Sequence, residues 1–223
     1  MRHALKFFLP FALWLFLMRD FLSGAIPVNM DTNTIYGVTK YYFNNLLNGV
    51  VPLWDPFVTL GRPFYAIAIC NLFNPVTQLV LLLKLLGVPY NVAFTVYLAA
   101  YFWVGCWGFY CLAKTLFKDR GIAWLAYLGL MFSSLGPAMF TQMTFLEIVV
   151  PAIWFFYFLL AFAQEQKSGN LLGLALAVMI ILSAYLPFYF LTVLGVFVIF
   201  YVLLYPGSAL DFLGKAIRFK STR

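Results

Sequence analysis

The sequence predicts an all-α fold, a polytopic membrane helix bundle with about six spanning helices. Three observations lead to this prediction. Hydrophobic residues make up 65% of the chain and charged residues only 9%, whereas about a quarter of the residues in soluble domains are charged. The apolar residues form long runs, and these runs lack the alternation of outer-membrane strands. Because backbone polar groups inside a bilayer must be satisfied within one element, helices are the expected spanning units.

The first apolar run covers 4–22, with Lys6 and Arg19 near its two ends. Its uninterrupted core, Phe7 to Met18, is short enough for a signal peptide, and Ser23-Gly24-Ala25 loosely resembles a cleavage site. A retained helix is the preferred interpretation, because the two basic side chains can reach opposite interfaces. Either alternative places the following loop, about 23–90, outside the cytoplasm.

Further spans are predicted after this loop. They cover 91–113, about 122–140 and about 145–163, followed by two helices within 171–205. The last stretch is too long for one ordinary span, and Pro187 indicates a tight turn between two helices. The chain is therefore expected to form a single transmembrane domain, 1–223, with a basic tail at 206–223. It could also be the N-terminal part of a longer protein.

Basic residues set the expected orientation, because cytoplasmic loops are enriched in Lys and Arg. With the N-terminus inside, ten of the fourteen Lys and Arg residues are cytoplasmic: Arg2, Lys6, Lys114, Lys118, Arg120, Lys167, Lys215, Arg218, Lys220 and Arg223. Both termini are then cytoplasmic, and the expected location is a bacterial cytoplasmic membrane. The net charge of +7 comes from patches at the ends of apolar runs and forms no continuous stripe, so nucleic acid is not an expected partner.

Two segments of the outer loop are predicted to lie along the membrane surface. Segment 31–48 places Ile35, Val38 and Tyr42 at helical spacing, while polar residues occupy the other face. Segment 75–87 is apolar but too short to span, so an interfacial helix or a re-entrant helix is expected there, and its Lys84 is interpreted as an interfacial anchor.

The sequence contains none of the motifs that mark common soluble enzymes. Cys70, Cys106 and Cys111 suggest neither a disulfide nor a metal site, and the single histidine, His3, lies in the basic N-terminal segment. No Gly-rich nucleotide loop and no Ser/His/Asp set can be assembled. The functional site is therefore expected in the polar segments of the outer loop.

Acidic residues are the main candidates for chemistry. Asp31 stands at the start of the first surface helix, where it suits an N-cap, and a carboxylate there can also accept a proton or help hold a cation. Asp55 precedes Pro56 in a segment whose prolines exclude regular helix, so a turn-forming role is preferred to a catalytic one. Glu147 is the acid placed inside a predicted span, a position that favours function.

Basic and aromatic residues complete the candidate site. Arg62 can bind phosphate as a bidentate fork, either on a substrate or on an ordinary lipid headgroup. Lys40 is interpreted first as part of a solvated helix face, and Trp54 suits an interface where one edge of the ring stays wet.

The segment from Asp31 to Pro63, above all Gly49-Val50-Val51-Pro52-Leu53-Trp54-Asp55-Pro56, resembles the N-terminal part of YfhO-type bacterial membrane proteins. Asn71-Leu72-Phe73-Asn74-Pro75 resembles that family's approach to its next helix. Family members are usually several times longer, and Ala184-Tyr185-Leu186-Pro187 replaces a Gly-His-Pro-like turn. The family is similar to the GT-C class of polytopic glycosyltransferases.

The resemblance implies transfer of a sugar from a polyprenyl-phosphate donor to an extracytoplasmic acceptor such as a cell-envelope glycopolymer. Of the residues here, the resemblance carries over only Asp31, as the essential acid of the first outer loop. Our hypothesis adds Arg62 and Lys40 to stabilise the leaving phosphate and Trp54, Asp55 and Glu147 to bind substrate. ATP is not required, because the lipid phosphate carries the activation, and a divalent cation is the candidate cofactor. The alternatives are a lipid or glycolipid transporter and a non-catalytic membrane subunit.

Overall fold

The computed structural model describes residues 2–56, 61–64, 76–182, 187–204 and 207, and within these it is mostly helical. The helices are α1 (Arg2–Leu17), α2 (Arg19–Leu22), α3 (Met30–Leu47), α5 (Gln78–Leu85), α6 (Tyr90–Phe117), α7 (Arg120–Met131), α8 (Leu135–Ala138), α9 (Met143–Gln164), α10 (Ser168–Leu182) and α11 (Pro187–Leu204). Two short strands, β1 (Trp54–Asp55) and β2 (Arg62–Pro63), pair antiparallel. The all-α prediction is confirmed, apart from this hairpin.

Two of these helices, α6 and α9, are long and apolar enough to cross a membrane. At about 1.5 Å per residue they measure roughly 42 Å and 33 Å, and a bilayer's hydrocarbon core is about 30 Å thick. Shorter apolar stretches occupy 5–17, 168–182 and 190–200. The boundaries predicted for the spans at 91–113 and 145–163 therefore fall inside α6 and α9.

Two predicted spans are interrupted. The stretch 122–140 divides into α7 and the single-turn α8, because the backbone leaves the helix after Met131. The first run, 4–22, breaks at Met18, and α2 follows as one turn. Two helices do occupy 171–205, with Pro187 at the first position of α11, while the turn predicted between them at 183–186 lies outside the described residues.

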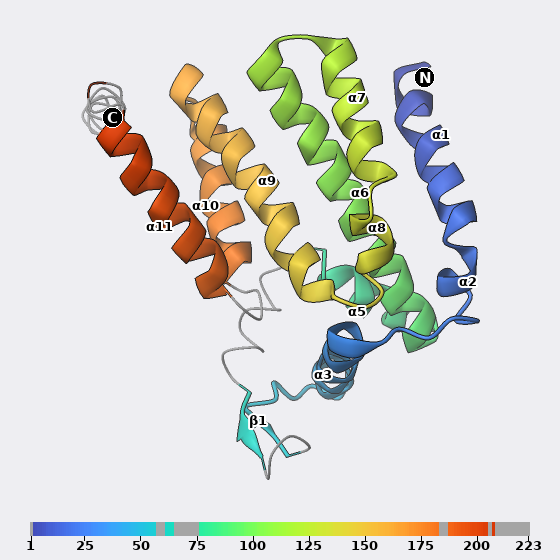
Figure 1. Cartoon of the computed structure of the whole chain (residues 1–223). Helices are drawn as coiled ribbons and strands as arrows, with labels where there is room; N and C mark the ends of the chain where they lie inside the picture. Colours follow the sequence, from blue (N-terminus) through green and yellow to red (C-terminus); the bar gives the residue numbers. More distant parts are fainter. Residues whose placement is uncertain (1, 57–60, 65–75, 183–186, 205–206, 208–223) are drawn as a thin grey trace.

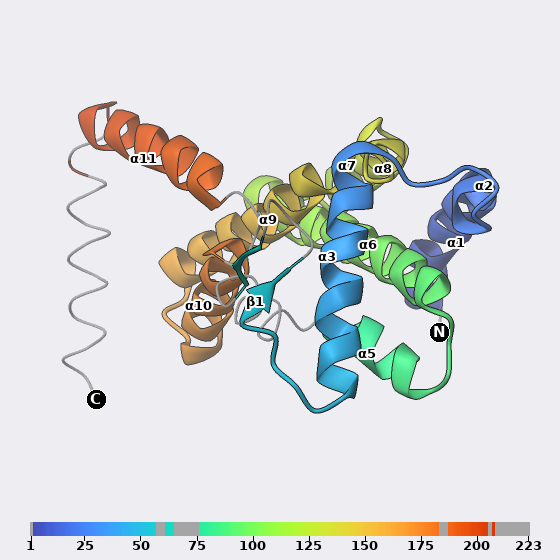
Figure 2. The same ribbon diagram turned by 90° about the horizontal axis from the view of Figure 1, so that it is seen from below.

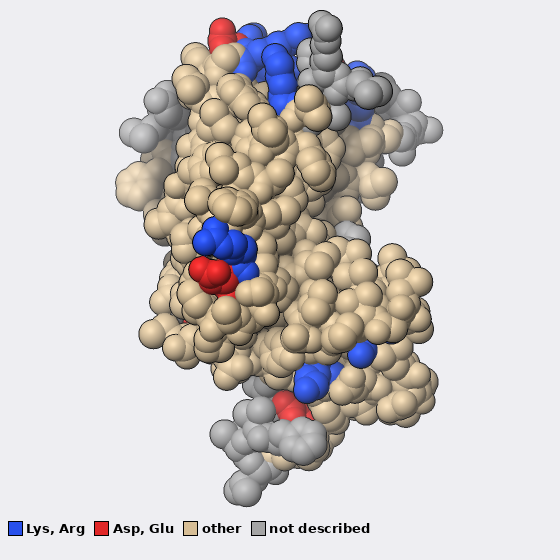
Figure 3. All heavy atoms as spheres, turned by 90° about the vertical axis from the view of Figure 1, so that its right-hand side faces the viewer, with Lys and Arg blue, Asp and Glu red and all other residues tan. Residues whose placement is uncertain are grey.

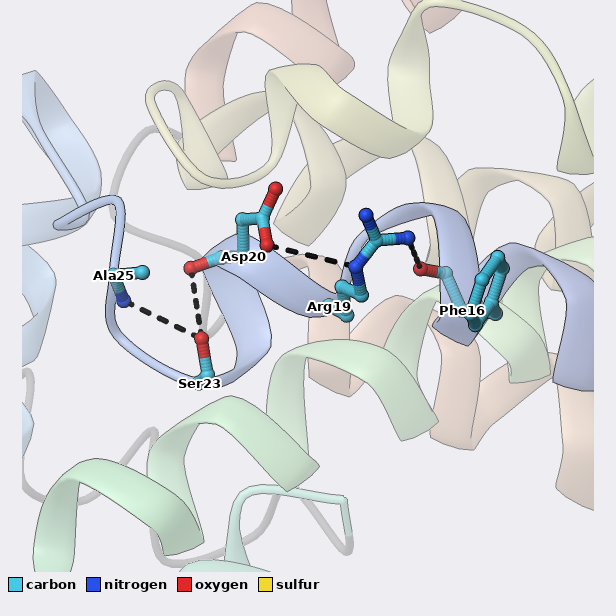
Figure 4. A network of polar contacts seen from close by, with 5 residues as sticks. All are labelled: Phe16, Arg19, Asp20, Ser23 and Ala25. Atoms are coloured by element: carbon cyan, nitrogen blue, oxygen red, sulfur yellow. Dashed lines mark hydrogen bonds and ion pairs between the residues drawn. The ribbon is translucent and has the colours of Figure 1, made fainter.

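A local polar network turns the chain after α2 (Figure 4). Arg19 Nη1 donates to the Phe16 carbonyl at 3.4 Å, and its Nε lies 3.7 Å from an Asp20 carboxylate oxygen. Ser23 Oγ donates to the Asp20 carbonyl at 3.3 Å and accepts from the Ala25 amide at 3.4 Å. The bonds to the Phe16 and Asp20 carbonyls involve backbone groups near the ends of α1 and α2, where helices leave carbonyls unpaired.

The long helices run side by side, and α3 lies across one end of them (Figures 1 and 2). In Figure 1 α3 is seen nearly end-on below the bundle, whereas Figure 2 shows its length beneath α6 and α9, with α5 beside it. Its inner face buries Ile35, Val38, Tyr42 and Phe43. This arrangement is the one expected of a surface helix, and the β1–β2 hairpin projects from the same end of the molecule (Figure 1).

The close packing of α6 on α9 depends on glycine. A Cβ at Gly105 would lie 2.6 Å from Val150 Cγ2, and one at Gly108 would lie 2.8 Å from the indole of Trp154. The main hydrophobic core is formed by side chains of α1, α3, α5, α6, α7 and α9, many of them aromatic. A smaller cluster around Phe155, Ile181 and Phe190 connects α9, α10 and α11.

Candidate functional site

A groove of about 460 Å³ runs along the outward face of α3 and reaches the hairpin. It is lined by Asn33, Thr34, Gly37, Val38, Lys40, Tyr41, Asn44 and Asp55. Its volume lies in the range of small-molecule sites, roughly 300–1,000 Å³. Two of the sequence-predicted residues, Lys40 and Asp55, therefore share one hollow with two amide side chains and a phenol.

The sequence of α3 explains why its polar residues face outward. Apolar positions recur at helical spacing along the inner face, and polar positions fill the rest of the turn. Tyr90, the first residue of α6, fixes this orientation: its hydroxyl hydrogen-bonds to Thr39 Oγ1 and also donates to the Tyr36 carbonyl at 3.2 Å. Lys40 follows Thr39 directly, so a buried anchor from α6 sets the position of the groove-facing lysine.

The hairpin supplies the other wall of the groove. Asp55 is only 3% exposed and pairs in register with Arg62. The Tyr41 hydroxyl donates to the Trp54 carbonyl at 2.7 Å, which ties the hairpin to α3. Gly61 has a φ of +101°, and a Cβ there would lie 2.5 Å from the Trp54 indole nitrogen, so the tight return requires glycine. Asp55, predicted first as a turn former, is a strand residue with the turn directly after it.

Asp31 lies in the first turn of α3 but does not line the groove. At about 100° per residue it points roughly 120° away from the groove-facing side of the helix. Its carboxylate is exposed and accepts a 3.3 Å hydrogen bond from Thr144 Oγ1 of α9. The N-cap is Asn29 rather than Asp31, with the Asn29 side chain accepting from the Met30 amide. The structure therefore separates Asp31 from Lys40 and Asp55.

A clasp of hydrogen bonds fastens the start of α3 to the α8–α9 turn. Thr32 Oγ1 donates to the Met139 carbonyl at 2.8 Å and accepts from the Met143 amide at 2.9 Å. Asn29 donates through its backbone amide to the Phe140 carbonyl at 3.1 Å. Thr32 is fully buried, so these bonds satisfy polar groups that water cannot reach.

The remaining predicted residues occupy different places. Glu147 is half-buried on α9, near Tyr97 of α6, and it does not line the groove. Trp54 is 52% exposed beside the groove. Arg62 is placed by its backbone alone, opposite Asp55, and its side chain lies outside the described part of the structure.

Tyr41, Asn33 and Asn44 are site residues whose role the sequence reasoning did not identify. The two asparagines were predicted only as polar positions of the surface helix, and helical spacing places them on the same face as Lys40. Across the described residues, no three His, Cys, Asp or Glu side chains come together in an arrangement that could hold a metal ion.

Comparison with known proteins adds no family. No protein-family model, curated protein or solved structure matches this chain. The candidate site is therefore defined by its own geometry: a groove at one end of a helical bundle whose lining includes a lysine, Lys40, and a buried carboxylate, Asp55.

Proposed function

We propose that the chain is a multi-pass membrane protein that binds a polyprenyl-phosphate-linked sugar in the α3 groove and transfers the sugar to an extracytoplasmic acceptor. Helices α6 and α9 are its central spans, and α1, α10 and α11 complete the transmembrane part. The single observation that carries the proposal is that Lys40 and Asp55 line one groove at the end of the bundle where the surface helix lies.

The charges of the groove suit such a donor. An ammonium group attracts a lipid phosphate, and amide and carboxylate groups hydrogen-bond to sugar hydroxyls. Lys40 is assigned to the phosphate, and Asn33 and Asn44 to the sugar. The position of the groove beside the candidate spans allows the polyprenyl chain to remain in the bilayer while its head group enters. The resemblance of 49–56 to YfhO-type proteins gives the proposal independent motivation.

Transfer requires a base and a stabilised leaving group. The acceptor hydroxyl oxygen bonds to the anomeric carbon, its proton passes to a carboxylate, and the bond from that carbon to the phosphate oxygen breaks. The electron pair of that bond leaves with the lipid phosphate, whose charge Lys40 stabilises. Asp55 is the better placed base, because it lines the groove, whereas Asp31 would require movement of α3 or of the substrate to take this role.

The position of Asp31 outside the groove favours a second candidate function, binding or transport of a glycolipid without chemistry. Both functions use the same groove, but only one forms a new glycosidic bond.

The decisive experiment uses the full chain in proteoliposomes with a radiolabelled polyprenyl-phosphate sugar. We expect Asp55→Asn to lower transfer by about a hundredfold or more, within the range for loss of a general base, and Asp31→Asn to lower it much less. Asp20→Asn, remote from the groove, is the control acid. Donor binding without any transferred sugar would replace the transferase proposal with the binding function, and absence of donor binding would remove both.

A further inference from the structure

We propose that the end of the molecule opposite α3 is a binding surface for anionic phospholipid, formed by the α6–α7 turn and the start of α1. The inference rests on the membrane location proposed above but not on sugar transfer.

Exposed cations gather at this end. Figure 3 shows Lys and Arg side chains concentrated at the upper end of the molecule, separated by a largely uncharged band from the charges lower down. Lys114 is in the last turn of α6, Lys118 is its C-cap, and Arg120 begins α7. All three are exposed. Lys6 of α1 lies near them, because its neighbour Phe7 packs against Tyr110 and Trp124.

Within the part of the chain that the structure describes, these cations form no ion pair. Arg19 pairs with Asp20 and Lys167 with Glu165, both away from the α6–α7 turn. The one acid of the turn, Asp119, is directed into the first turn of α7, where its Oδ1 accepts from the Ile122 amide at 2.8 Å. The turn therefore presents three positive charges whose nearest carboxylate is engaged as a helix cap.

Apolar side chains next to the cations identify the partner as a lipid rather than a soluble polyanion. Leu116, Phe117 and Leu125 are 54%, 60% and 67% exposed, and Ile122 is 45% exposed. A soluble phosphate compound would use the cations alone and leave these side chains in water. A phospholipid contacts both the cations and the apolar side chains. Its phosphate binds Lys114, Lys118 and Arg120, and its acyl chains lie along α6 and α7.

The arrangement predicts selectivity for head groups with net negative charge. Zwitterionic phosphatidylcholine carries its own ammonium group, which the cations repel. Each basic residue near an anionic membrane surface contributes about fivefold to binding. Removal of three should therefore lower the preference for phosphatidylglycerol over phosphatidylcholine by about a hundredfold where the three contributions are independent.

The test uses the full chain purified in detergent, with retained lipid counted by native mass spectrometry after exposure to equal amounts of the two lipids. We compare the wild type with Lys114→Gln/Lys118→Gln/Arg120→Gln. Arg19→Gln is the control, because it removes a cation of equal charge that is already paired with Asp20. Lys114→Arg/Lys118→Arg preserves charge and should preserve selectivity.

Equal retention of the two lipids by the wild type, or unchanged selectivity in the triple variant, would overturn the proposal. Equal losses in the triple variant and in Arg19→Gln would also overturn it, because they would indicate a general charge effect. Competition by soluble glycerol phosphate at the lipid concentration would show that acyl chains contribute nothing, which contradicts a lipid site. Asp55→Asn should retain full lipid selectivity, so failure of sugar transfer and failure of lipid binding are distinguishable.

Discussion

Replacement of Gly105 by alanine tests whether direct helix contact holds α6 against α9. The two helices are in extensive contact. An alanine Cβ at this position would lie 2.6 Å from Val150 Cγ2, far inside van der Waals contact. Val150 is 2% exposed, and a β-branched side chain in a helix has one strongly preferred rotamer, so it cannot rotate away.

The expected cost follows from two opposing effects. Overpacking of a filled interior costs about 1–3 kcal/mol. Alanine in place of glycine in a helix stabilises it by about 0.5–1 kcal/mol. The net expectation is a loss of about 1–2 kcal/mol in the free energy of unfolding.

Gly129→Ala is the matched control, because it places the same methyl group on α7 with no atom within 4 Å of the new Cβ. It should show only the stabilising helix effect. The assay is unfolding in mixed micelles with increasing dodecyl sulfate, followed by tryptophan fluorescence. A Gly105→Ala protein as stable as the Gly129→Ala protein would refute the close-contact argument.

Val150→Ala provides an independent check of the same contact. Alone it should destabilise by leaving a cavity, but combined with Gly105→Ala it removes the clash. A double-mutant cycle should then give a favourable coupling of about 1 kcal/mol or more, whereas strict additivity would mean that the two residues do not touch.

Three further predictions concern the candidate site and its surroundings. Gly61→Ala should open the β1–β2 hairpin, because φ is +101° and the Trp54 indole occupies the space; a red shift of Trp54 emission and weaker donor binding would report it, and unchanged spectra would contradict it. Tyr42→Phe should stabilise the protein by about 1 kcal/mol, since its buried hydroxyl has no partner among the described residues and an unsatisfied buried donor is costly. Burial raises the pKa of Tyr42 from 10.0 to about 12, so ionisation of this phenol favours the unfolded state: it has no effect on stability below pH 10 and lowers stability as the pH rises toward 12, a loss that Tyr42→Phe removes; spectrophotometric titration of wild type and variant measures this. Lys167→Gln should raise the pKa of Glu165 toward its ordinary value, because the neighbouring ammonium lowers the pKa of that carboxyl; carboxyl titration by NMR checks the direction, and an unchanged Glu165 pKa would show that the pair does not form.

The sequence alone predicted the helices whose extent depends on the local pattern of apolar residues and prolines. The extents of α3 and α9 follow from apolar periodicity and length, and the start of α11 at Pro187 follows from the fixed φ of proline. The interruption after Met131 was not predicted, because hydropathy alone does not distinguish a continuous span from a helix that ends and turns within apolar surroundings. The chain that follows this end reaches Thr32 through Met139, a contact between residues more than a hundred positions apart.

The candidate site was predicted only in part, for a similar reason. Lys40 and the polar face of α3 were identifiable from spacing, because helical geometry fixes which residues share a face. The separation of Asp31 from Asp55 depends on the hairpin: the Trp54 carbonyl of β1 accepts from the Tyr41 hydroxyl, and the return at Gly61 pairs β2 with β1. Contacts of so short a strand leave little local signal in the sequence.

The clasp at the start of α3 has a consequence for biogenesis. Thr32 bonds to Met139 and Met143, which are 107 and 111 positions later in the chain. At a synthesis rate of about 5–20 residues per second, Thr32 waits roughly 5–20 seconds for these partners to leave the ribosome. The start of α3 can therefore be fastened only after the beginning of α9 has been made, and a nascent chain halted before that point would hold α3 through Tyr90 of α6 but not at its first turn.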